Sequence, residues 1–357
     1  MRVSTPSAYG LECTLATCTT DPGCTTFLWE IVANSVDEHL AGHASRMRVS
    51  VERDLAEVED DGRGIPVEVH PRSGKSALEV ILTTLCGSGT RNGHLPHVHV
   101  SPLHFGGGLS PVNAVCEDLE VEVRRDRYAW RQRYARGVPL APLERGERTD
   151  RTGTRIRIRP DRAIFSSTCF DRARIRGRLQ ELAYFNPGLT IDCNSERLRE
   201  PEGLAAWVRR MAADHGTEAR DVFRTFGTED GVQYDVALAW TDTALSELRS
   251  YVGQNETMEG GTHERGFCEG VVRAVAGLGK GSGRPARASR VMPRLRPGLL
   301  GIVHVLPRDV RFGAPTRDRL CSPEARRVVR DRVADALGAW LSERPELARE
   351  LLARIAS

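Results

Sequence analysis

The chain has 357 residues, 40% of them hydrophobic and 28% charged, so it can bury a substantial core and divide into two domains. This composition excludes a disordered tail. The 51 basic and 48 acidic residues leave a formal net charge of only +3, which argues neither for nor against a nucleic-acid partner. All but two of the basic residues are arginine, and we therefore attribute local arginine clusters to a compositional bias first.

No run of 18 apolar residues and no signal-peptide core occur, which predicts a cytoplasmic protein without a membrane segment. The odd number of cysteines, nine, fits a reducing compartment. Cys13, Cys18 and Cys24 lie close together but lack a CxxC pair, and residues 94–104 contain four histidines. Zinc or another metal at either group is the less favoured interpretation, and we expect residues 94–104 to form a loop.

Residues 25–44, TTFLWEIVANSVDEHLAGHA, carry apolar side chains at helical spacing and predict an amphipathic helix. Glu30, Asn34 and Glu38 are four residues apart and therefore project from one side of this helix. A solvated helix face is the alternative interpretation. A carboxylate and an amide one turn apart are also the groups that a magnesium–triphosphate site needs, as a base for water and as a hard oxygen ligand.

Residues 47–60 alternate apolar and polar side chains on both sides of a turn, which predicts a β-hairpin. The segment DDGRGIP follows at residues 60–66, where the second strand ends. Its glycines permit positive φ and close backbone approach, and its proline stiffens the exit. A rigid carboxylate beside bare backbone suits a planar polar ligand, whereas an ordinary acidic turn is the alternative.

Residues 73–85 again show the helical pattern, and residues 86–108 are rich in glycine and histidine. A long irregular segment inside a compact domain is typically a lid or a disordered insertion. The glycine run at 106–108 opens onto an apolar helix, so its N–H groups could bind phosphate. Residues 119–138 and 153–160 then alternate as strands whose polar side is mostly arginine.

The second half of the chain alternates predicted helices and strands. We expect a linking helix at 201–216, strands at 232–240 and 298–307, a helix from about 262, a linker at 277–290 and a long helix from 323. Ser322 and Pro323 are the expected N-cap and first-turn residues of the last helix. The whole pattern predicts an α+β fold.

Four segments of the first half, at residues 30–42, 58–85, 106–115 and 150–161, stand in one characteristic order. Together they resemble the GHKL ATPase domain of the DNA gyrase B protein and of its topoisomerase IV relative. The second half resembles the transducer domain of the same protein through three segments, at residues 255–267, 296–307 and 315–329.

The resemblance implies an ATP-binding sandwich of the Bergerat type over residues 1–214 and a transducer of the ribosomal S5 second-domain type over residues 215–357. Carried over by position, Glu30 is implied as the general base and Asn34 as the Mg²⁺ ligand. Arg317 is implied as the cation that reaches the γ-phosphate. The residues implied to bind ATP are Asn34, Glu38, Asp60, Arg63, Gly64, Ile65, Pro66, Gly106, Gly107, Gly108, Arg131 and Thr154.

The sequence also departs from the family pattern. Pro102 and Leu103 replace glycines of the phosphate lid, and two lid lysines have no counterpart. Thr26 stands where the family has a histidine that orients the base, and Ala33 where it has an aspartate. We therefore expect a weaker grip on phosphate and less support for Glu30. Because the chain ends after the transducer, we do not expect a complete topoisomerase subunit.

The leading hypothesis is a Mg²⁺-dependent ATPase module in which ATP closes the lid or drives formation of a homodimer. Two alternatives stay open: a stand-alone biosynthetic enzyme that activates a small molecule with ATP, and a non-hydrolysing interaction protein for a gyrase-type partner. The arginines of residues 122–136 and 283–296 could form a track for DNA, but the arginine bias of the chain explains them as well.

Overall fold

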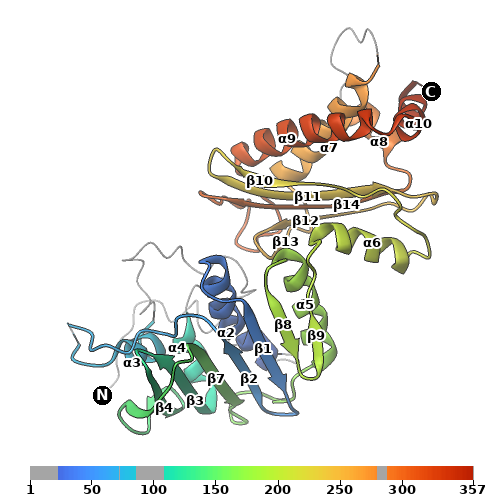
Figure 1. Ribbon diagram of the computed structural model, residues 1–357. Helices are drawn as coiled ribbons and strands as arrows, with labels where there is room; N and C mark the ends of the chain where they lie inside the picture. The colour runs from blue at the N-terminus through green and yellow to red at the C-terminus, as the bar shows by residue number, and fades with distance from the viewer. Residues whose placement is uncertain (1–22, 72, 86–107, 280–287, 357) are drawn as a thin grey trace. The chain divides into compact units, whose positions relative to one another are not determined.

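The computed structural model describes residues 23–71, 73–85, 108–279 and 288–356. The chain divides into two compact units, one ending at Pro201 and the other beginning at Glu202 (Figure 1). None of the helices in these ranges is both long and apolar enough to cross a membrane.

The first unit is built on a nine-stranded sheet with the order β5-β4-β3-β7-β2-β1-β8-β9 and with β6 beside β4. Neighbouring strands are antiparallel except β1 and β8, and β1 and β2 form the predicted hairpin. The strands are β1 (Arg46–Val51), β2 (Ala56–Asp60), β3 (Cys116–Arg125), β4 (Tyr128–Ala135), β5 (Val138–Pro139), β6 (Glu144–Arg148), β7 (Gly153–Pro160), β8 (Thr190–Cys193) and β9 (Glu196–Leu198).

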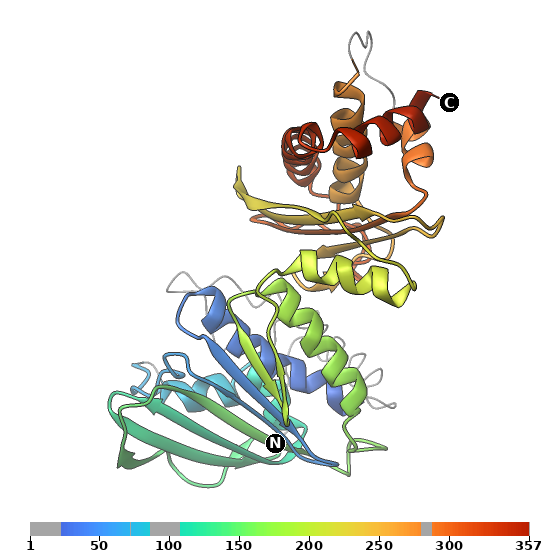
Figure 2. The ribbon, with the colours of Figure 1, turned by 45° about the vertical axis from the view of Figure 1, so that its right-hand side comes forward.

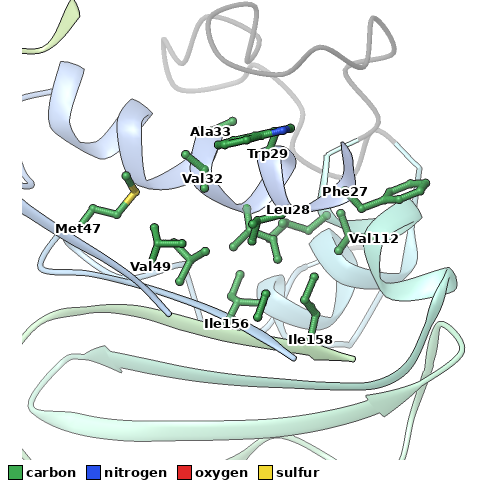
Figure 3. Packing of buried hydrophobic residues seen from close by; sticks show 14 of the residues in the cluster. Phe27, Leu28, Trp29, Val32, Ala33, Met47, Val49, Val112, Ile156 and Ile158 are labelled. Atoms are coloured by element: carbon green, nitrogen blue, oxygen red, sulfur yellow. The ribbon is translucent and has the colours of Figure 1, made fainter. Parts of the chain in front are cut away.

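Four helices of this unit pack on one face of the sheet (Figures 1 and 2): α2 (Gly23–Leu40), α3 (Ala77–Thr83), α4 (Leu109–Ala114) and α5 (Arg172–Phe185). Figure 3 shows apolar side chains of α2, among them Leu28 and Val32, above Val49 of β1 and Ile156 of β7. In the central strands β1, β2, β3 and β7, the alternating residues that point to this face are buried, as the period of two predicts.

The opposite face of the first sheet carries a cross-strand ladder of charged residues. From β4 to β9 the directly opposed residues are Arg131, Glu122, Arg155, Glu59, Arg48, Asp192 and Arg197. Glu122 accepts from Arg131 at 2.8 Å and from Arg155 at 3.1 Å, and Glu59 accepts from Arg48 at 3.0 Å. The arginine-rich polar side predicted for these strands is therefore largely neutralised by carboxylates.

The second unit has a five-stranded sheet with the order β10-β11-β14-β12-β13, antiparallel except between β12 and β14. Its strands are β10 (Phe223–Glu229), β11 (Val232–Trp240), β12 (Glu247–Val252), β13 (Asn255–Glu256) and β14 (Leu299–Pro307). On one face lie α7 (Thr262–Gly277), α8 (Ala288–Leu295), α9 (Pro323–Ser342) and α10 (Pro345–Ala356), and α6 (Leu204–Asp214) lies on the other (Figures 1 and 2). Coverage of both faces explains the nearly unbroken apolar run of β14.

Helix α6 belongs to the second unit, whereas the sequence placed the domain limit after residue 214, at its end. Its apolar face packs on the second sheet, where the rings of Trp207 and Tyr251 lie 5.5 Å apart. Because burial of that face requires the second sheet, the compact units divide before the helix.

Helices α7 and α9 approach each other at two glycines. A Cβ atom on Gly266 would lie 2.4 Å from the carbonyl oxygen of Arg326, and one on Gly270 would lie 2.8 Å from that of Arg330. These distances are shorter than any van der Waals contact, so this packing requires glycine at both positions.

Candidate ATP site

Asp60 is the last residue of β2 and its side chain is buried, with 6% of the residue exposed. Its Oδ1 accepts the N–H of Gly62 at 2.9 Å and that of Thr154 at 3.3 Å, and its Oδ2 accepts the Ser35 hydroxyl at 2.9 Å. Burial raises the pKa of Asp60, and the three hydrogen bonds offset only part of that shift. The site therefore holds a fixed, poorly solvated carboxyl group.

The loop after Asp60 is held tightly against β7. Gly64 and Gly153 have positive φ values of +80° and +129°. A Cβ atom on Gly153 would lie 2.0 Å from the carbonyl oxygen of Asp60, so only glycine fits there. The N–H of Ile65 donates to Thr154 Oγ1 at 3.1 Å, and this bond fixes the chain just before Pro66.

Arg63 and Glu38 connect the same loop to α2. Glu38 accepts the backbone N–H of Arg63 at 3.0 Å, and its carboxylate also accepts from Nε at 3.1 Å and from Nη2 at 2.8 Å. Burial by itself would raise the pKa of Glu38, but the bonds and charge of Arg63 outweigh it and the pKa lies below its ordinary value. Glu38 is therefore ionised in the folded protein at neutral pH, and both of its carboxylate oxygens accept hydrogen bonds from Arg63.

Glu30 and Asn34 lie one turn apart on α2, as predicted. Glu30 is 5% exposed and Asn34 is half-buried. An amide oxygen beside a carboxylate is a donor set that suits Mg²⁺, which prefers hard oxygen ligands. Thr26 lies one turn before Glu30, and Ala33 is packed in the core (Figure 3).

No cluster of three or more His, Cys, Asp or Glu side chains that could hold a metal is present in the described part of the chain. Cys24 is buried in α2. Cys13, Cys18 and the histidine-rich residues 94–104 lie outside the described residues.

The glycine run was predicted to bind phosphate. Gly108 directly precedes α4 and has a φ of +66°. Gly106, Gly107 and the two lid replacements, Pro102 and Leu103, lie outside the described residues.

Arg125 contacts the loop after Asp60. Arg125 Nη1 donates to the carbonyl oxygen of Gly64 at 2.8 Å, whereas Arg131 on β4 donates to Glu122. A cavity of about 270 Å³ adjoins the loop, lined by His43, Gly62, Arg63, Arg125, Asp126 and Thr152. The structure thus places Arg125 beside Arg63 and sets Arg131 within the charge ladder.

Sequence reasoning missed Ser35 and Arg125. Ser35 is 2% exposed and is a hydroxyl residue on the apolar side of α2, between Val32 and Val36, which was the available signal. No such signal marked Arg125, because it is one of several arginines in the β3–β4 hairpin. Arg317 belongs to the second unit and is half-buried there.

Two family models match the chain. Residues 21–164 match the model described as histidine kinase-, DNA gyrase B-, and HSP90-like ATPase, and residues 203–357 match the model of DNA gyrase B. The DNA gyrase B protein of Halalkalibacterium halodurans is 35% identical over 345 residues, which cover 94% of this chain and 54% of the relative. That of Thermotoga maritima is 34% identical over 92% of this chain and 54% of the relative. The chain therefore spans about half the length of these relatives.

Solved structures match over nearly the whole chain. The 43K ATPase domain of Thermus thermophilus gyrase B, in complex with an aminocoumarin, is 30% identical with a TM-score of 0.78, covering 97% of this chain and 94% of that one. The topoisomerase IV ATP-binding domain of Francisella tularensis is 27% identical with a TM-score of 0.75, covering 92% and 90%. The predicted α+β fold is thereby confirmed, and the chain belongs to the GHKL ATPase family of DNA gyrase B.

Proposed function

We propose that this chain binds ATP and Mg²⁺ in the first unit and hydrolyses ATP slowly. The observation that carries the proposal is the fixed carboxyl group of Asp60. A carboxylate has about four acceptor positions, and Ser35, Gly62 and Thr154 take three of them. The remaining position can accept a hydrogen bond from the amino group of adenine. That bond would satisfy the last acceptor position of this buried carboxyl group.

The other residues of the site have the chemistry that hydrolysis requires. The Glu30 carboxylate can take a proton from an attacking water, and such assistance contributes roughly 10²- to 10⁴-fold to rate. Asn34 would hold Mg²⁺, which when bound offsets the negative charge of the phosphate groups. We propose that Arg317 supplies positive charge during turnover, in place of a family lysine. Arg63, paired with Glu38, and Arg125 would border the base.

Slow turnover is expected because Thr26 is shorter than histidine and uncharged, so it can orient Glu30 only weakly. ATP binding would drive lid closure or dimerisation, as the family resemblance implies. A biosynthetic ATP-dependent enzyme is the alternative, and it differs in requiring an acceptor for turnover.

Product analysis of the purified chain with ATP and Mg²⁺ tests the proposal. We expect ADP and phosphate without added acceptor, no ADP from the Glu30→Gln variant, and ATP binding by both. Glu52→Gln, at an exposed glutamate in the β1–β2 turn, is the matched control and should hydrolyse ATP like the wild type. Equal turnover by Glu30→Gln would contradict the assigned base. ATP binding without ADP from the wild type would identify a non-hydrolysing protein.

A further inference from the structure

The segment that carries Arg317, residues 308–322, connects β14 to α9 and contains a tight turn at residues 314–317. The N–H of Arg317 donates to the carbonyl oxygen of Ala314 at 3.1 Å, with Pro315 at the second position of the turn. Arg317 has a φ of +58°, in the left-handed region. A residue with a side chain stays in that region only when its surroundings hold it there.

Strand β13 and the turn between it and α7 supply those surroundings. Asn255 Nδ2 donates to the carbonyl oxygen of Arg317 at 3.0 Å. One residue later, the carbonyl oxygen of Asp318 accepts the N–H of Glu259 at 2.9 Å. The segment is thus fixed at two successive carbonyl groups, the first by a side chain and the second by the backbone.

Leu320 anchors the far end of the segment to the same turn. Its N–H donates to Gly260 at 3.1 Å, and its carbonyl oxygen accepts from the N–H of Thr262 at 3.0 Å. A Cβ atom on Gly261 would lie 2.4 Å from that carbonyl oxygen, so the two chains are in direct backbone contact. Ser322 is fully buried at the predicted N-cap of α9, but its hydroxyl bonds Asp309 and Arg311 instead of capping the helix.

Buried polar residues contact this turn through hydrogen bonds. Thr257 Oγ1 donates to the carbonyl oxygen of Ser250 at 3.0 Å and lies 3.2 Å from His263 Nε2. His263 is fully buried, and its Nδ1 has no hydrogen-bond partner among the described residues. The turn is therefore held by buried hydrogen bonds, and the Asn255 side chain of β13 connects this region to Arg317.

We propose that Asn255 is a positioning residue for Arg317. By holding the main-chain carbonyl group it keeps Arg317 in the left-handed conformation, in which the guanidinium carbon lies 5.7 Å from the centre of the Phe312 ring. Release of the carbonyl group would let φ relax and redirect the guanidinium. This inference rests on the proposed function, in which Arg317 acts in turnover, and it assigns a role to the sequence NETMEGG.

Steady-state ATP hydrolysis by Asn255→Ala tests the proposal. We expect kcat about tenfold lower, because a misdirected charged group loses most of its effect, with a KM for ATP within about twofold of the wild type. Asn255→Asp should lower kcat to a similar extent as Asn255→Ala, since a carboxylate cannot donate a hydrogen bond to a carbonyl group. Met258→Ala, in the same turn and 77% exposed, is the control and should keep wild-type kcat.

A double variant separates positioning from general damage. In an Arg317→Ala background, Asn255→Ala should lower kcat no further. An additional tenfold loss there, wild-type kcat in Asn255→Ala alone, or wild-type kcat in Arg317→Ala would each overturn the proposal.

Hydrogen exchange provides a test that needs no turnover. Asn255→Ala should speed amide exchange in residues 312–320 without changing exchange in β14, and unchanged exchange in 312–320 would overturn the positioning role. A wild-type chain that binds ATP without hydrolysing it, with the predicted change in exchange, would refute the proposed ATPase activity and leave the contact established.

Discussion

The Ser35 hydroxyl on α2 donates to Asp60 Oδ2 at the end of β2, at 2.9 Å. This bond joins the helix that carries Glu30 and Asn34 to the strand that carries the carboxyl group proposed to bind the adenine base. A hydroxyl can also accept, so an amide at position 60 would keep the contact, with its NH₂ donating to Ser35 Oγ. Asp60→Asn is therefore a substitution that the site can accommodate.

We expect Asp60→Asn to weaken ATP binding by about 1.5 to 3 kcal/mol, the range for hydrogen bonds that involve a charged group. Isothermal titration calorimetry measures this directly. Without nucleotide the variant should melt at a higher temperature than the wild type at pH 7, because burial raises the pKa of Asp60 and its charged form destabilises the fold. Asp61→Asn is the neighbouring control: Asp61 accepts from Ser45 and Arg46, so its replacement should leave ATP affinity unchanged.

His263 predicts a loss of stability in acid. Burial, with a smaller contribution from the charge of His304, lowers the pKa of His263 to about 3. The unfolded chain takes up a proton below its ordinary pKa of 6.5, whereas the folded chain does so only near 3, so stability is lost progressively between those values. At pH 4.5 the second unit should be about 2 to 3 kcal/mol less stable than at pH 7 from this group.

Urea unfolding at both pH values, with and without His263→Gln, checks the effect. The variant should lose less stability between pH 7 and 4.5 than the wild type does. His215→Gln is the comparison, because His215 is partly exposed and pairs with Glu247 at 2.8 Å. An identical acid dependence in His263→Gln and wild type would contradict the assignment.

Two of the three glycines of α7, Gly266 and Gly277, differ in their surroundings and give opposite predictions. Gly266→Ala should destabilise the second unit by about 1 to 3 kcal/mol, because the methyl group overlaps the α9 backbone. Gly277→Ala should be neutral or stabilising by about 0.4 to 1 kcal/mol, since no atom lies within 4 Å of its Cβ position. Thermal unfolding distinguishes them, and equal melting temperatures would show that α7 and α9 can separate without loss.

We expect any DNA binding by this chain to be electrostatic and to fall steeply with salt. Arg131 and Arg133 lie in the arginine-rich stretch but donate to Glu122 and Asp118, at 2.8 and 2.9 Å. Arg131→Gln should therefore leave the slope of log affinity against log salt unchanged in a fluorescence-anisotropy titration. Sequence-selective binding that survives high salt would contradict this prediction.

The elements of the fold could be predicted because each shows its period in the local sequence. The β1–β2 hairpin, α2 and β14 were all predicted from alternation, helical spacing or an unbroken apolar run. The contact between Arg125 and Gly64 could not be predicted, since it depends on where β3 ends relative to the loop. The family resemblance implied Arg131 at the mouth of the adenine pocket, and that role stays a prediction.

Pairing between distant segments limited the site prediction as well. Asp60 and Thr154 were predicted together from the family resemblance, and the structure brings them into contact. Ser35 was missed because its partner, Asp60, lies 25 residues away along the chain. From the local sequence, Ser35 is only one more residue of an amphipathic helix. The place of α6 depends on which sheet buries its apolar face, and the helix sequence alone does not contain that information.

The charge ladder of the first sheet has a consequence for how its strands find their neighbours. On that face most strands carry mainly one sign of charge: arginine on β4 (Arg131, Arg133), β7 (Arg155, Arg157, Arg159) and β1 (Arg46, Arg48), and carboxylate on β3 (Asp118, Glu120, Glu122), β2 (Glu57, Glu59) and β8 (Asp192). Arg124 of β3 is the exception, and it pairs with Glu122 and Glu59. Strands of like sign repel when paired, so β2 next to β3, or β1 next to β7, is disfavoured. A shift of β7 by two residues would still oppose unlike charges, which leaves register to close contacts such as Gly153 against Asp60. The ladder thus encodes the order of the strands and not their alignment, and reversing the sign of one whole strand should misorder the sheet.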